Sequence, residues 1–119
     1  MRLLIIGTLK GQLTTATKIA VDRGANVTHA TDTGQALAVL RSKGADLIMI
    51  DVGLDIRELV DKLASEHMSV PVAACGVDND ARAAVAAIHA GAKEYIPLPP
   101  DAELIAAVLA AVTHDDREL

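Results

Sequence analysis

The chain has 119 residues and a formal net charge of −5, from 11 basic and 16 acidic residues. Its length predicts one domain, and a hydrophobic content of 51% excludes a disordered chain. The acidic balance and the absence of Phe and Trp argue against nucleic-acid binding by this segment, because such binding needs a basic face or stacking rings.

Short apolar runs alternate along the chain with longer segments of helical periodicity. We expect five strands, over residues 3–6, 26–30, 47–50, 70–75 and 94–96. We expect a helix after each strand, over residues 12–23, 34–43, 56–67, 81–90 and 102–113. The predicted N-caps of the second, fourth and fifth helices are Thr33, Asp80 and Asp101. Residues 1–113 are therefore expected to form the domain, and residues 114–119 a tail or the start of a linker.

The alternating order predicts a parallel α/β sheet with helices on both faces, because connections of this length are crossovers. Five strands favour a flavodoxin-like fold, in which the carboxyl ends of the first and third strands flank a ligand crevice. Residues 47–50 are consecutively apolar, which is typical of a strand buried on both faces. Asp51 follows directly, so we expect its carboxylate at the carboxyl edge of the sheet.

Four features together resemble the receiver domains of response regulators. They are Asp51 after the third strand, Pro71-Val72 opening the fourth, Ala90-Gly91-Ala92 before the fifth, and the turn over residues 97–99. More narrowly, residues 11–13, 74–78 and above all 91–100 resemble the amino-terminal domain of FlbD-type flagellar regulators of alphaproteobacteria. This resemblance implies a domain of an NtrC-class transcription activator that works with the alternative sigma factor. It also implies ATPase and DNA-binding domains beyond residue 119.

The sequence departs from a working receiver at the positions that carry its chemistry. The acidic pair that holds Mg²⁺ after the first strand falls on Gly7 and Thr8. The hydroxyl residue after the fourth strand falls on Gly76, and the lysine after the fifth falls on Leu98. Asp51 thus keeps the phosphoacceptor position without the groups that bind metal and stabilise phosphoryl oxygens. The resemblance therefore implies a non-catalytic pseudo-receiver with no metal and no cofactor.

Two other hypotheses remain open. A true phosphoacceptor receiver would use Asp51 and would need a Mg²⁺ site. An enzyme or cofactor carrier on the same sheet would need convergent polar groups, which the side chains of Gly7, Gly76 and Leu98 do not supply.

Cys75 is the only cysteine, so no internal disulfide is possible and a cytoplasmic location fits. It lies in a strand expected to be buried, which favours a small core residue over a nucleophile. The four histidines form no i, i+4 pair, which argues against a metal site. No apolar run approaches the roughly 20 residues of a membrane helix.

The resemblance implies control by a protein partner similar to the flagellar assembly factor FliX, in place of a sensor kinase. We predict docking on the alanine-rich fourth helix and the turn after the fifth strand, because alanines allow close approach and an aromatic ring can anchor the contact. The candidate contacts are Ala84, Ile88, Tyr95, Leu98 and Pro99. An alternative surface lies on the first helix, with Leu13, Thr17 and Ala20. A homo-oligomer also remains open.

Overall fold

The computed structural model describes residues 2–7, 12–76 and 81–97, and beyond them residues 103, 106, 107 and 110. Strands and helices alternate along the described chain. The strands are β1 (Arg2–Ile6), β2 (Asn26–Ala30), β3 (Leu47–Asp51), β4 (Val72–Gly76) and β5 (Glu94–Pro97). The helices are α1 (Gln12–Asp22), α2 (Thr33–Ser42), α3 (Ile56–Ser65) and α4 (Ala81–Ala90).

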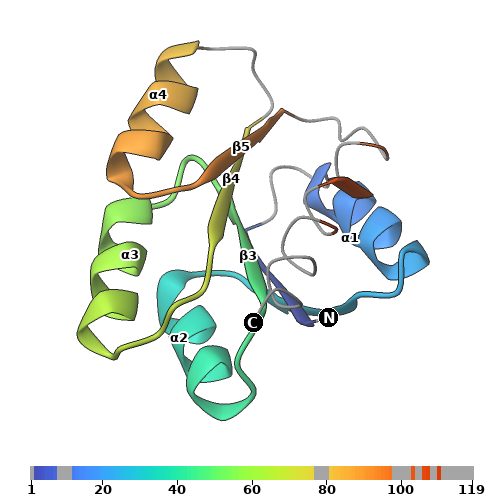
Figure 1. The fold of residues 1–119 in the computed structure, drawn as a ribbon, viewed down its shortest axis with the longest axis horizontal. Coiled ribbons are helices and arrows are strands. Elements are labelled where there is room, and N and C mark those ends of the chain that lie inside the picture. Colours follow the sequence, from blue (N-terminus) through green and yellow to red (C-terminus); the bar gives the residue numbers. More distant parts are fainter. Residues whose placement is uncertain are drawn as a thin grey trace.

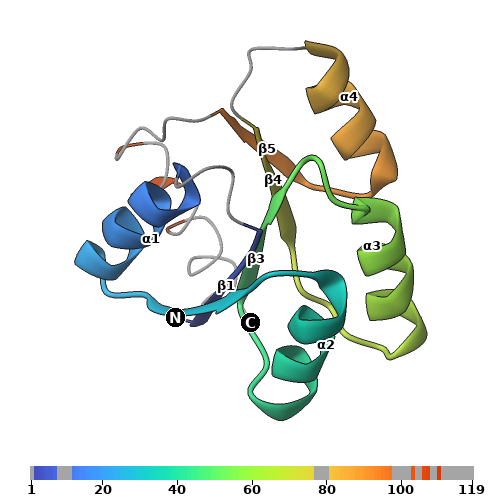
Figure 2. The same cartoon turned by 180° about the vertical axis from the view of Figure 1, so that it is seen from behind.

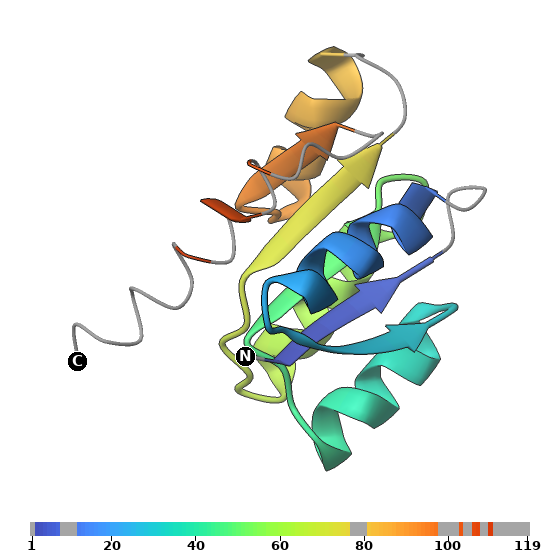
Figure 3. The same ribbon diagram turned by 90° about the vertical axis from the view of Figure 1, so that its right-hand side faces the viewer.

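The strands form one parallel sheet in the order β2-β1-β3-β4-β5. Figure 3 shows their arrows running in a common direction. This order and direction confirm the predicted flavodoxin-like fold. β3 is the middle strand, and its four apolar residues are buried while Asp51 at its end is half-buried. The carboxylate therefore stands at the carboxyl edge of the sheet, as predicted.

Helices cover both faces of the sheet, with α1 on one side and α2, α3 and α4 on the other (Figures 1 and 2). Alternate residues of each strand enter two different cores. Ile5 and Met49 belong to the core under α1, whereas Ile6 and Ile50 belong to the core under the other three helices. Both cores are aliphatic, so burial of branched side chains on two faces supplies the main driving force for this sheet.

Most predicted boundaries lie within one residue of those in the structure, and three local differences are the clearest. The N-cap of α2 is Asp32, not Thr33, because the Asp32 carboxylate accepts a hydrogen bond from the Gln35 amide at 2.8 Å. α3 ends at Ser65, two residues earlier than expected, since His67 has a positive φ of 58° that terminates the helix. β4 begins only at Val72.

Several predicted features fall outside the described residues. They are Thr8, the Asp80 cap, Leu98, Pro99, the Asp101 cap and the tail over residues 114–119. Of the predicted last helix, residues 103, 106, 107 and 110 are described, and they are helical. The domain boundary at residue 113 stays a prediction. Among the described residues, no helix is both long and apolar enough to cross a membrane.

Candidate functional site at the Asp51 edge

The Asp51 edge is where β1, β3 and β4 end side by side. Ile6 of β1 pairs with Ile50 of β3, and Asp51 pairs with Cys75 of β4. Gly7 therefore follows β1 on one side of Asp51, and Gly76 ends β4 on the other. The sheet thus brings together the three positions that the sequence placed at this crevice.

Gly7 lies in contact with Asp51 and has a backbone that favours glycine. Its φ is +103°, and a Cβ added to it would lie 2.7 Å from the Asp51 Cβ. Two hydrogen bonds hold this backbone: the Gly7 amide donates to the Ala30 carbonyl at 2.9 Å, and His29 Nε2 donates to the Gly7 carbonyl at 2.7 Å. A carboxylate at position 7 would therefore require the strand end to move.

The carboxylate of Asp51 takes part in the turn that follows it. Its Oδ1 accepts a hydrogen bond from the Gly53 amide at 2.7 Å, and its carbonyl accepts one from the Leu54 amide at 3.0 Å. The Val52 amide donates to the Cys75 carbonyl at 2.8 Å, which ties the same turn to β4. One carboxylate oxygen is thus engaged in holding the chain, which is the local structural role expected of an Asx turn.

A receiver fold implies Mg²⁺ at this edge, and the described residues do not fit that ion. Mg²⁺ prefers octahedral oxygen ligands with one or two carboxylates. Asp51 has Gly7 against its Cβ and Gly53 against its Oδ1, so neither neighbour brings a side-chain oxygen. In the described part of the chain, no cluster of three or more His, Cys, Asp or Glu residues can hold a metal.

Gly76 and Tyr95 meet at the same edge. A Cβ added to Gly76 would overlap the Tyr95 hydroxyl oxygen and lie 3.1 Å from the ring carbon Cζ. The tyrosine is half-buried and packs against the core under α2, α3 and α4. The phenol therefore occupies the volume in which any side chain at position 76 would begin.

Cys75 is fully buried beside Asp51. Burial and, to a smaller extent, the neighbouring Asp51 charge together raise the pKa of its thiol to about 12. The thiolate is the reactive form of cysteine, so this thiol is unreactive at neutral pH. This location confirms the small core residue that the sequence predicted.

The α4 surface, defined as the outward side of α4 with Ala84, Val85 and Ile88, carries the described part of the predicted docking face. Ile88 is 45% exposed, and Ala84 and Tyr95 are half-buried. Val85 is 56% exposed and was missed in the sequence, although its position three residues before Ile88 places both on the side away from buried Ala87.

The alternative surface on α1 is weaker than expected. Ala20 is fully buried, so its expected place in that surface is wrong. A helix residue four positions from buried Ala16 faces the core with it. Thr17 is half-buried, and the side chain of Leu13 lies outside the described residues. Among the described side chains of α1, the large apolar one that is exposed is Val21, at 54%.

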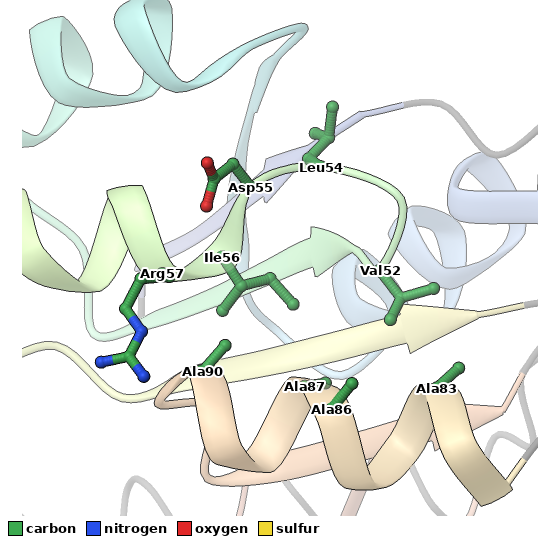
Figure 4. A pocket seen from close by; sticks show the side chains of 9 residues that line it. All are labelled: Val52, Leu54, Asp55, Ile56, Arg57, Ala83, Ala86, Ala87 and Ala90. Carbon is green, nitrogen blue, oxygen red and sulfur yellow. The ribbon is translucent and has the colours of Figure 1, made fainter.

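A cavity of about 310 Å³ opens between α4 and the segment that joins β3 to α3. Figure 4 shows four alanine side chains pointing from α4 toward the start of α3, where Ile56 points back at them. Because alanine side chains are short, they leave this space unfilled. The lining residues are Val52, Leu54, Asp55, Ile56, Arg57, Ala83, Ala86, Ala87 and Ala90.

Comparison with known proteins places this site in a family context. The model described as "Response regulator receiver domain" matches residues 3–110. The transcriptional regulatory protein FlbD of Caulobacter vibrioides is 58% identical over 100% of this chain, which is 26% of FlbD. The DNA-binding transcriptional regulator NtrC of Salmonella typhimurium is 34% identical over 67% of this chain and 18% of NtrC. The chain thus spans about a quarter or less of the length of these curated relatives.

The solved structures agree on the fold. The crystal structure of NtrX from Brucella abortus in complex with ADP superposes with a TM-score of 0.84 at 24% identity, covering 98% of this chain and 26% of that one. The isolated receiver domain of the same NtrX gives a TM-score of 0.79 at 23% identity, over 92% of this chain and 96% of that one. At these identities, the likeness supports the fold alone.

Proposed function

Because this chain belongs to the response regulator receiver domain family, we propose that it is the regulatory domain of a flagellar NtrC-class transcription activator, controlled by a protein partner in place of phosphorylation. Its likeness to FlbD over the whole chain, and to NtrC over two thirds of it, supports the transcriptional role. The partner is a regulatory protein similar to FliX, as the resemblance to FlbD-type regulators implies. The ATPase and DNA-binding functions belong to other parts of such a regulator.

The observation that carries this proposal is the contact between Gly7 and Asp51. Aspartyl phosphorylation in a receiver depends on a metal held beside the phosphoacceptor, and position 7 is one of the two that would supply the acidic ligands. Here that position has a φ of +103° and no room for a Cβ next to Asp51. The carboxylate also accepts a hydrogen bond from the Gly53 amide, which holds the turn after β3.

The α4 surface supports control by a protein. Val85 and Ile88 are large apolar side chains that stay about half exposed, and the alanine-lined cavity adjoins the same helix. The exposed apolar side chains lie on the outward side of α4, away from the cavity, and offer a partner an apolar contact. Binding there should depend little on salt, because the contact is mainly apolar.

The first experiment tests phosphorylation directly. The chain is incubated with acetyl phosphate and Mg²⁺ and analysed by intact-mass spectrometry, with an NtrC receiver domain as the positive control. We expect the NtrC domain to gain a phosphoryl group and this chain to remain unmodified. A phosphoryl group on Asp51 would support the alternative, a true phosphoacceptor receiver.

The second experiment tests the partner. Affinity for a FliX-like protein is measured for wild type, Ala84→Glu, Ile88→Asp, Tyr95→Ala and Leu98→Asp, each first checked for folding. We expect weaker binding by Ile88→Asp, because a buried unpaired carboxylate is costly at an apolar contact. Wild-type affinity in all four folded variants would show that the docking face lies elsewhere. If wild type itself does not bind, the proposal of a FliX-like partner is wrong.

A further inference from the structure

The single tyrosine of this chain lies in a slot that a glycine creates. Tyr95 is on β5, where it pairs with Ala74 of β4. Gly76 is two residues further along β4, at the carboxyl edge. The phenol hydroxyl reaches the position where a Gly76 Cβ would stand, so the ring runs along the sheet toward the Asp51 edge.

The other side of this slot is formed by Val52, the residue after Asp51. Its Cγ1 would lie 3.1 Å from a Cβ at position 76, which is also the distance from that Cβ to Tyr95 Cζ. Carbon atoms in contact normally stand about 3.5–4.0 Å apart. A methyl group at position 76 would therefore be too close to two neighbours and would overlap a third atom, the phenol oxygen.

Glycine is not required at position 76 by its backbone. Its φ lies outside the left-handed region, unlike those of Gly7, Gly24, Gly44 and Gly91. Glycine is also costly in an ordered position, because it loses more conformational entropy on folding than other residues. Since the backbone does not need glycine here, the space that its missing side chain leaves for Tyr95 explains its presence.

We propose that Gly76 is a positioning residue that holds Tyr95 across the carboxyl edge of the sheet. The ring is then fixed in one position beside Gly76. A side chain at position 76 displaces the ring outward. This inference goes beyond the proposed function, because it concerns one ring whatever partner binds.

The test uses the fact that Tyr95 is the only aromatic residue of the chain. Its fluorescence reports on one side chain, and acrylamide quenching measures how accessible that ring is. We expect low quenching in wild type, and no change when Mg²⁺ and beryllofluoride are added. In Gly76→Ala and Gly76→Ser, quenching should rise toward the value of the same chain unfolded in urea. Gly34→Ala, a substitution at an exposed position of α2 that does not contact Tyr95, should match wild type.

Each result decides the matter. Wild-type quenching equal to that of the unfolded chain, or unchanged quenching in a folded Gly76→Ala, would overturn the inference. If Gly76→Ala does not fold, the double variant Gly76→Ala/Tyr95→Ala is examined by circular dichroism. Recovery of the fold would support the clash with the phenol, whereas failure would show that glycine serves another purpose at this position.

Discussion

Small residues have opposite effects in two regions of this domain, the Asp51 edge and helix α4. At the Asp51 edge, Gly7 and Gly76 let a strand end and the Tyr95 ring approach until no room for a side chain remains. On α4, alanines leave a cavity on one side of the helix, while Val85 and Ile88 stay exposed on its outward side. One region is tightly packed, and the other leaves a cavity and exposed apolar side chains.

The difference follows from what replaces the missing side chain. Beside a glycine at a strand end, the space of the missing side chain is filled by atoms of the neighbouring strand or by an aromatic ring. This is possible because neighbouring strands of a sheet lie about 5 Å apart. The alanines of α4 face the start of α3, and their short side chains do not fill the space between the two helices. Small residues therefore give close packing at the Asp51 edge and an unfilled space beside α4.

The largest effect should come from restoring the acidic residue at position 7. We expect Gly7→Asp to lose about 2–5 kcal/mol of unfolding free energy in urea titration, from backbone strain and overlap with Asp51. The matched control is Gly24→Asp, because Gly24 has a similar φ of +91° but open space around it. Equal losses in the two variants, with Mg²⁺ binding by Gly7→Asp, would show that the edge is open after all.

A smaller loss should follow removal of the Asp51 carboxylate. Asp51→Ala deletes the acceptor for the Gly53 amide, so we expect a loss of about 1–3 kcal/mol. Asp51→Asn keeps an acceptor oxygen and should lose less. If both variants unfold at the wild-type urea midpoint, the carboxylate has no role in holding the turn.

The open region can be tested with two valines of nearly equal exposure. Val85 on α4 is 56% exposed and Val21 on α1 is 54% exposed, so Val85→Asp and Val21→Asp should each change stability by less than about 0.5 kcal/mol. Only Val85→Asp should weaken binding to a FliX-like protein, by about tenfold. Equal affinities of the two variants would place the contact away from the outward side of α4.

The smallest effect should come from the buried thiol of Cys75, beside Asp51. The pKa of Cys75 is raised to about 12 from an unfolded value of 9.0, so the folded state keeps its proton longer. The stability that the protonated thiol contributes is complete below about pH 9 and decreases as pH rises toward 12. Compared with Cys75→Ala, wild type should therefore lose on the order of 1 kcal/mol more by about pH 9.5. Parallel pH profiles of the two proteins would contradict the burial of this thiol.

Most of the fold could be predicted from the sequence, because its cause is local. Four apolar residues before Asp51 indicate a strand buried on two faces, and glycine stops separate the helices. The Thr33 cap was wrong, because Asp32 and Thr33 are both good caps and only the path of the chain decides between them. Ala20 was misplaced for a similar reason, since the orientation of a weakly amphipathic helix depends on tertiary packing.

The site was predictable only as a set of positions. The sequence showed that Gly7 and Gly76 lack the groups a receiver uses, and it placed both beside Asp51. It could not show that Gly7 contacts the Asp51 Cβ or that the Tyr95 hydroxyl fills the space at Gly76, because these distances join residues far apart in the chain. Val85 was overlooked because valine is usually buried, and nothing in an alanine-rich helix shows which side faces outward.

The most direct test of the account is the affinity of the FliX-like partner for wild type and Asp51→Asn, each measured with and without acetyl phosphate and Mg²⁺. If a partner controls a domain that phosphorylation does not reach, all four affinities should agree within experimental error, because a ligand shifts an equilibrium only through differential affinity. A change on adding acetyl phosphate that occurs in wild type and is absent in Asp51→Asn would contradict the account.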